Sequence, residues 1–154
     1  MIKLLFIAVM LLQSQAKASC QAHGDHESID QLCGTDMPIN NTIFYENTSQ
    51  EPIVLWRVYN TSYPQSAMGR WWSLDDPTKS SKDEYRQANA ICPEWSPLDG
   101  IAKCELRPGG DFVIGHTDAV RCKTVNYLAS DTLQIFLVNP LEDLYNCTVS
   151  DWED

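Results

Sequence analysis

A chain of 154 residues with a formal net charge of −10 has the length of one domain and a strongly acidic composition. Its 21 acidic residues outnumber 11 basic ones, so its surface repels phosphate backbones and anionic lipid at long range. These numbers argue against nucleic acid and membrane surfaces as partners. They leave room for a local basic pocket that binds one small phosphorylated ligand.

The N-terminus has the three parts of a secretory signal peptide. A basic start at residues 1–3 precedes an apolar run at 4–12, and Ala16-Lys17-Ala18 is an Ala-x-Ala cleavage pattern. The apolar run is too short to span a bilayer. We therefore expect a signal peptide over 1–18 and a secreted product, extracellular or periplasmic in a bacterium, without stable membrane insertion. Loss of Lys3 and Lys17 leaves nine basic against 21 acidic residues, a net charge of −12.

All the cysteines follow the signal peptide: Cys20, Cys33, Cys92, Cys104, Cys122 and Cys147. An even number in an oxidising compartment predicts three disulfides, although spacing does not resolve their pairing. A lipid anchor on Cys20 is disfavoured because Lys17 stands where a lipoprotein signal has an aliphatic residue. No Cys-x-x-Cys pair occurs, so we expect no metal.

Asn-x-Ser/Thr acceptor sequences begin at Asn40, Asn47, Asn60 and Asn146. If the host is a eukaryote, these residues are predicted glycosylation sites. In a bacterium they would carry no meaning, and the sequence does not decide the kingdom.

The predicted elements then follow in chain order. Residues 19–51 are polar with little periodicity, which suggests an extension that the fold does not need. The β-branched and aromatic run 53–59 predicts a strand, 70–74 a second strand, and 80–91 a helix that ends before Pro93. Residues 101–106 and 111–115, joined by Arg-Pro-Gly-Gly, predict a hairpin, and 132–138 a buried strand. We expect an α+β domain over 52–154, with short strands split around one main helix.

Two features of this domain suggest a binding site. Arg57 lies within an apolar strand, where burial is costly unless the guanidinium meets an anion or a cleft. Trp71-Trp72-Ser73 places an aromatic face beside a hydroxyl. The alternatives are an edge-strand arginine that reaches water and core tryptophans with an incidental serine.

The order of these motifs resembles the ADP-ribosyltransferase-like toxin domains at the C-termini of bacterial polymorphic and type VI effectors. Members open with a Tyr-Arg-Val strand, here Trp56-Arg57-Val58, and continue with a Gly-Arg-aromatic-aromatic-Ser/Thr strand, here residues 69–73. A helix containing an arginine leads to Leu-Pro-Glu-Trp, here residues 92–95, and a Gln-to-Asn-Pro element corresponds to residues 134–140. The resemblance covers residues 53–140.

The resemblance implies an ADP-ribosyltransferase-like split sheet and a cleft for NAD, which is the substrate. Arg57 would hold the NAD phosphates and ribose, Ser73 would order the nicotinamide side, and Trp71 or Trp72 would stack on the ring. A carboxylate would stabilise the oxocarbenium-like centre that forms as nicotinamide leaves. Many members have a glutamate where this chain has Gln134. The charge would then come from Asp131, Glu94 or Glu142, or the domain works weakly, or it no longer catalyses. The implied activity is transfer to an unidentified protein target or NAD hydrolysis by a toxin or effector.

Two other classes remain open. A disulfide-stabilised secreted binding protein or inhibitor would explain the cysteines, acidity and sequons without catalysis. A secreted ribonuclease is disfavoured by the negative charge and by His116 being the lone histidine in the core segment. Serine hydrolysis lacks a Gly-x-Ser-x-Gly sequence.

The cysteine count generates a first prediction. Ellman titration of denatured, unreduced mature protein should detect almost no free thiol, since all six cysteines follow the signal peptide. Several free thiols per chain would contradict three disulfides.

Overall fold

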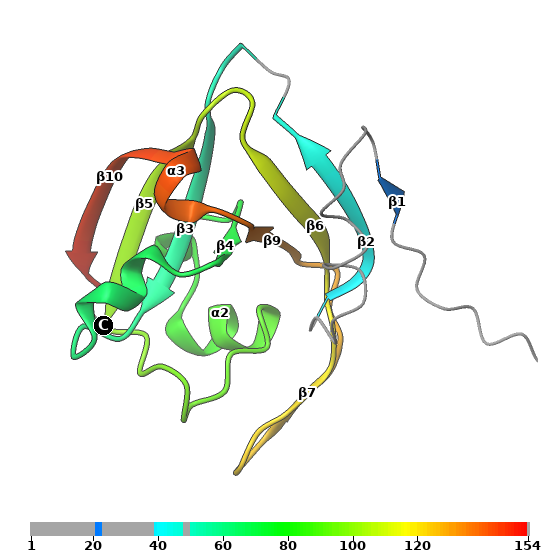
Figure 1. Ribbon diagram of the computed structural model, residues 1–154. Helices are drawn as coiled ribbons and strands as arrows, with labels where there is room; N and C mark the ends of the chain where they lie inside the picture. Colours follow the sequence, from blue (N-terminus) through cyan, green and yellow to red (C-terminus); the bar gives the residue numbers. More distant parts are fainter. Residues whose placement is uncertain (1–20, 23–38, 48–49, 154) are drawn as a thin grey trace, which may run out of the picture.

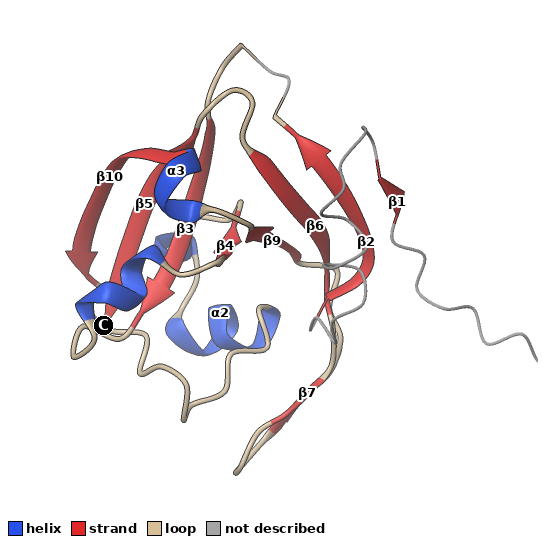
Figure 2. Cartoon of the chain, viewed as in Figure 1, coloured by secondary structure: helices blue, strands red, loops and turns tan. Residues whose placement is uncertain are grey.

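The structure is a computed structural model that describes residues 21–22, 39–47 and 50–153. These residues form an α+β fold with a mostly antiparallel sheet and a few short helices (Figure 1, Figure 2), which confirms the predicted class. The sheet strands are β1 (Gln21–Ala22), β2 (Ile39–Glu46), β3 (Ile53–Tyr59), β4 (Trp71–Ser73), β5 (Gly100–Leu106), β6 (Asp111–Thr117), β9 (Leu133–Leu137) and β10 (Leu144–Asp151). The other elements are the hairpin of β7 (Val120–Arg121) and β8 (Asn126–Tyr127), the 3-10 helices η1 (Pro64–Met68) and η2 (Pro77–Lys79), and the helices α2 (Lys82–Ala88) and α3 (Pro140–Asp143).

The sheet divides into two blocks at its centre. Its strand order is β1-β2-β6-β9-β4-β3-β5-β10, and β3 pairs with β4 at one position, Trp56 opposite Ser73. The β3–β5–β10 block and the β2–β6–β9 block are therefore joined through the three-residue β4. Figure 1 shows β3, β5 and β10 on one side and β6 and β2 on the other, with β4 and β9 between them and α2 below.

Strand alternation in β3 supplies two hydrophobic clusters. Leu55 and Tyr59 pack with Trp72 and Leu137 in one cluster, whereas Val58 packs with Tyr85 of α2 in the other. Successive strand residues point to opposite faces, so one apolar strand can serve both clusters. This explains why β3 reads as a nearly continuous apolar run.

Helix α2 is shorter than the predicted helix over 80–91. A capping box starts it, in which the Ser81 hydroxyl accepts a hydrogen bond from the Glu84 N–H and the Glu84 carboxylate accepts from the Ser81 N–H. The helix ends at Ala88 because the chain turns at Asn89 and enters the left-handed region at Ala90, with φ 48°. Pro93 therefore lies after the end of the helix and is not what ends it.

The predicted hairpin of 101–106 and 111–115 is wrong. Strand β5 pairs with β3 and β10, whereas β6 pairs with β2 and β9, so the Arg107–Gly110 turn transfers the chain between blocks. The Asn47 amide donates hydrogen bonds to the Leu106 and Arg107 carbonyls at 3.2 and 3.1 Å. Asn47 also binds Gly109 and Gly110 through its backbone, so a distant residue satisfies the polar groups that a hairpin partner would have satisfied.

Residues 39–46 are part of the sheet, which the prediction of a polar extension over 19–51 did not foresee. Strand β2 runs antiparallel to β6 and pairs from Ile39 opposite Thr117 to Glu46 opposite Asp111. Removing this strand would expose a long edge of β6, so deletion of residues 21–50 is now expected to destabilise the fold. The predicted signal peptide and most of the extension lie outside the described residues.

Asn47 is also a correction to the predicted glycosylation sites. Its side chain is 3% exposed, and its Nδ2 donates to the two carbonyls named above. A glycan on Nδ2 would replace one of these hydrogens and could not fit the buried position. Asn146 is exposed and Asn60 half-buried, while the side chain of Asn40 lies outside the described set.

Asn47→Ala should lower the free energy of unfolding by about 1–3 kcal/mol, because it leaves buried carbonyls without their donor. Urea denaturation of protein made in bacteria, where no glycan is added, measures this loss. Asn126→Ala, on the exposed side of β8, is the matched control and should change stability little. Equal midpoints for the two variants would contradict the structural role of Asn47.

Candidate functional site

A cavity of about 340 Å³ lies where β3 and β4 part, beside α2 and the segment 89–98 that follows it. Its aromatic lining residues are Trp56, Tyr59, Tyr63, Trp71, Trp72, Tyr85 and Trp95. Its polar lining residues are Arg57, Asn60, Ser66, Ser73, Asn89, Ser96 and Gln134. The volume and the mixture of aromatic walls with a few polar groups are typical of small-molecule sites. The residues predicted to bind NAD, namely Arg57, Trp71, Trp72, Ser73 and Gln134, all lie in this lining, although their roles remain predictions.

Arg57 bridges the gap between the two blocks with its side chain. Its Nε donates a hydrogen bond to the Ser66 carbonyl at 2.7 Å, and Nη1 donates to the Trp71 carbonyl at 2.6 Å. Strands β3 and β4 diverge immediately after Trp56, so a guanidinium supplies the donors that a continued ladder would have supplied. Arg57 is therefore a structural residue as well as a cavity residue.

Gly69 makes room for this guanidinium. A Cβ atom at Gly69 would lie 2.5 Å from the Arg57 Cζ, closer than non-bonded atoms approach. The glycine of the Gly-Arg-aromatic sequence thus has a packing reason, because any side chain there would displace Arg57. The glycine of this sequence motif is therefore required by the position of the Arg57 guanidinium.

Among the described residues that line the cavity, the Arg57 charge has no carboxylate partner. No aspartate or glutamate is among the lining residues, and burial lowers the pKa of Arg57 from its ordinary value. An arginine nevertheless stays protonated at neutral pH. A half-buried cation that faces a cavity without a counter-charge is suited to an anionic ligand.

The two adjacent tryptophans have different roles. Trp72 is 2% exposed, belongs to the main hydrophobic cluster and donates its indole N–H to the Gly69 carbonyl at 2.7 Å. Trp71 is half-buried and packs edge-on against Phe136, with ring centroids 4.9 Å apart. Between the two candidates for ring stacking, Trp71 is the one with a face that a ligand could reach.

Ser73, Gln134 and Tyr85 lie together on one side of the cavity. Ser73 and Gln134 are opposite one another on the paired strands β4 and β9. The Gln134 Nε2 donates to the Asn89 carbonyl at 2.7 Å, which leaves Oε1 as an acceptor. Burial raises the pKa of Tyr85 to about 12, although a side-chain hydrogen bond from Ser73 partly offsets the rise.

The acidic residues that could have replaced a catalytic glutamate do not line the cavity. Glu94 accepts a hydrogen bond from the Lys123 N–H at 2.8 Å, which lowers the pKa of its carboxyl. Asp131 and Glu142 are exposed and are also absent from the lining. The polar groups described in the cavity are thus one cation and neutral donors and acceptors.

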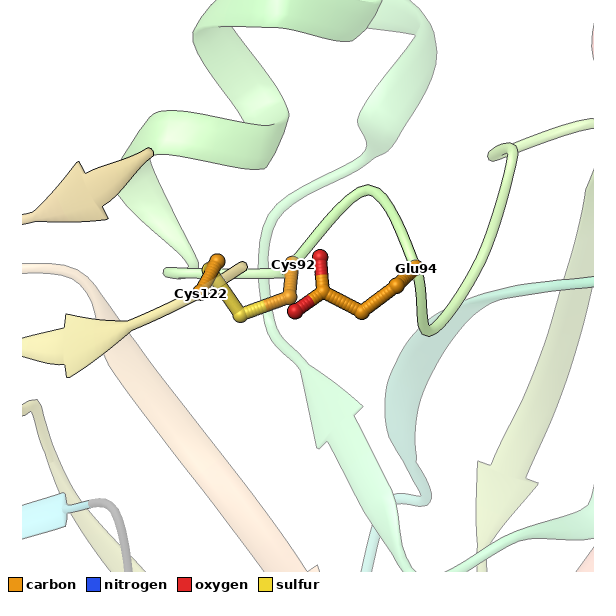
Figure 3. A group of neighbouring side chains, drawn as sticks. All are labelled: Cys92, Glu94 and Cys122. Carbon is orange, nitrogen blue, oxygen red and sulfur yellow. A yellow bond between two sulfur atoms is a disulfide. The ribbon is translucent and has the colours of Figure 1, made fainter. Parts of the chain in front are cut away.

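Two of the predicted disulfides are present. Cys92 is bonded to Cys122 and Cys104 to Cys147, while Cys20 and Cys33 lie outside the described residues. Glu94 lies beside the Cys92–Cys122 bridge (Figure 3). The two sulfur atoms of that bridge are bonded to each other and are not available as metal ligands. None of the described helices combines the length and apolarity that a membrane span requires.

Comparisons with known proteins do not assign a family. No protein-family model matches the chain, and no curated protein matches it. A solved structure described as "Structure of Tne2 in complex with Tni2" aligns with a TM-score of 0.49 and 11% identity, covering 75% of this chain and 92% of that one. A match at this level assigns neither a family nor a function.

Sequence reasoning missed several residues of the lining. Tyr85 was within the predicted helix, and its isolation among polar neighbours marked it as the buried position of α2. Trp95 was part of the Pro-Glu-Trp sequence but had no assigned role. Asn89 and Tyr63 gave no signal, because they reach the cavity through turns that no periodicity reveals.

The raised pKa of Tyr85 generates a prediction about alkaline stability. The unfolded chain would ionise this phenol near pH 10, so its stabilising effect is complete below that pH and is lost as pH rises toward 12. Chemical denaturation between pH 10 and 12 should show a loss of roughly 2–3 kcal/mol that Tyr85→Phe lacks. Equal losses in the two proteins would show that Tyr85 is not the buried phenol.

Proposed function

We propose that the cavity binds NAD and that the protein is a secreted effector that consumes it, by ADP-ribosyl transfer to a protein target or by hydrolysis. The observation that carries the proposal is Arg57, a half-buried cation in an aromatic cavity whose described lining residues include no carboxylate. NAD combines a pyrophosphate with two planar rings, which matches that pairing of charge and aromatic surface. The two disulfides fit an oxidising compartment, as secretion requires.

Different residues of the cavity would bind different parts of NAD. Two of the five Arg57 N–H groups are used by the Ser66 and Trp71 carbonyls, so the remaining groups can bind pyrophosphate oxygens. Trp71 would stack against a ring, and Ser73 with the Gln134 Oε1 would bind ribose or carboxamide groups. Tyr85 stays protonated at neutral pH and would hold Ser73 in position.

The chemical step would break the bond between the nicotinamide nitrogen and ribose C1′. Nicotinamide leaves as a neutral molecule with the bonding electron pair, and water or a target side chain bonds to C1′ and releases a proton. The cationic ribose requires nearby negative potential. In this cavity that potential would come from oxygen dipoles such as the Gln134 Oε1, a weaker source than a carboxylate.

A non-catalytic binding protein is the second candidate. It is favoured by the absence of a carboxylate from the described lining and by Gln134 in place of a glutamate. Such a protein would hold NAD or a related anion without cleaving it.

Calorimetric titration with NAD tests the binding proposal. Arg57→Ala should weaken binding by roughly 1.5–3 kcal/mol, because charge-assisted hydrogen bonds to phosphate are lost. It should also lower the melting temperature, since the Ser66 and Trp71 carbonyls lose their donor. Arg57→Lys should retain a charge and recover binding only in part. Arg121→Ala, at an exposed position outside the cavity, is the control and should bind as wild type does.

Nicotinamide release separates the catalytic from the non-catalytic candidate. Wild type should release nicotinamide from NAD, and Gln134→Glu should leave turnover unchanged or reduce it if the site is active as it stands. NAD binding without release, followed by release in Gln134→Glu, would identify a site that has lost catalysis. Failure of wild type to bind NAD would overturn the proposed function.

A further inference from the structure

One wall of the cavity comes from a single segment, residues 89–98. It contributes Asn89, Ala90, Ile91, Trp95 and Ser96 to the lining. Trp95 is 58% exposed and belongs to no hydrophobic cluster of the described residues. Its ring is therefore not used in the core and is accessible from the cavity that it lines.

The backbone of this segment is held in an unfavourable conformation. Ala90 and Leu98 have φ values of 48° and 59°, in the left-handed region that non-glycine residues avoid. Such conformations persist where surrounding contacts over-determine them, and they concentrate at ligand-binding sites. Here the Arg86 guanidinium supplies such contacts, with Nη1 donating to the Ile91 carbonyl at 3.1 Å and Nη2 to the Ser96 carbonyl at 2.9 Å.

A covalent brace lies next to Trp95. Cys92, which is fully buried, is bonded to Cys122 in the loop between β7 and β8 (Figure 3). Glu94 accepts a hydrogen bond from the N–H of Lys123 in the same loop. The Trp95 N–H donates to the Cys92 carbonyl at 2.9 Å, so the turn carrying Trp95 starts at the bridged cysteine. Two residues of the segment, Cys92 and Glu94, are thereby joined to the same hairpin.

We propose that residues 89–98 form a braced wall, that the Cys92–Cys122 bridge is its brace, and that Trp95 is the ring-stacking residue that this wall presents to the ligand. A tryptophan fixed before binding loses little conformational freedom when a planar ring stacks on it. Trp71 and Trp95 would then contact the ligand from β4 and from the braced wall. The role of Trp95 rests on the proposed NAD binding, whereas the brace does not.

The brace is tested without ligand, by hydrogen exchange. Cys92→Ser/Cys122→Ser should accelerate amide exchange at Ile91, Trp95 and Leu98 by at least about tenfold, because local opening is no longer limited by the bridge. Cys104→Ser/Cys147→Ser is the matched control, since it removes a bridge between β5 and β10 and no residue of that pair lines the cavity. Equal exchange of the segment in the two variants would overturn the brace.

The stacking role is tested by comparing ligands with and without a ring. Trp95→Ala should raise the Kd for NAD and AMP about 5- to 150-fold while leaving the affinity for pyrophosphate unchanged. Trp95→Phe should recover most of the loss, and Leu141→Ala, at a position 77% exposed on α3, should have no effect. The melting temperature should stay constant in Trp95→Ala, because the side chain is exposed.

The outcomes separate this inference from the proposed function. Unchanged NAD and AMP binding in Trp95→Ala would overturn the stacking role and leave the NAD proposal intact. An equal loss of pyrophosphate binding would show that the variant disturbs the Arg57 region, and would also overturn the stacking role. Absence of NAD and AMP binding in wild type would overturn the proposed function together with the Trp95 role, while hydrogen exchange still decides the brace.

Discussion

The Arg57 guanidinium, bonded to the Ser66 and Trp71 carbonyls, is the contact on which the centre of the molecule depends. The two blocks of the sheet meet through β4, and β3 and β4 share one paired position. Beyond that position the backbone cannot continue the ladder, and a charged side chain occupies the space instead. Gly69 is without a side chain for the same reason. The cavity lies where β3 and β4 separate, and the side chain that bridges these strands is the cation that the cavity contains.

If the proposed function is correct, this arrangement couples stability to ligand binding. The hydrogen bonds that hold Arg57 would orient its remaining donors before any ligand arrives, so little reorganisation would be needed on binding. The neutral lining around Arg57 sets the limit on chemistry, since oxygen dipoles stabilise a cationic centre less than a carboxylate does. Whether the site cleaves its ligand depends on that difference.

Much of the site could be predicted from local sequence, and much of the topology could not. Arg57, Trp71, Ser73 and Gln134 lie on β3, β4 and β9, strands that the sequence composition predicted, and the resemblance singled out Gln134. The β5–β6 connection was misassigned because its turn is satisfied by Asn47, a contact between residues about sixty positions apart that no local pattern encodes. Strand β2 was missed for a related reason: its apolar residues Ile43, Phe44 and Tyr45 are consecutive and do not alternate with polar ones, and the strand is recognised by its pairing with β6. The conformation of segment 89–98 depends on a disulfide and on hydrogen bonds from Arg86. The spacing of residues in the sequence could not show which groups these two would contact.

The central claim is that Arg57 is the anion-binding group of the cavity, and the Nε–H signals of the arginines test it most directly. In a ¹H–¹⁵N correlation spectrum, adding NAD should shift the Arg57 signal progressively and saturably. The signals of Arg70 and Arg121, which are exposed and outside the lining, should stay in place. An Arg57 signal that does not shift would contradict the account. So would equal shifts of all three signals that grow in proportion to the NAD concentration without saturating, as a general salt effect would produce.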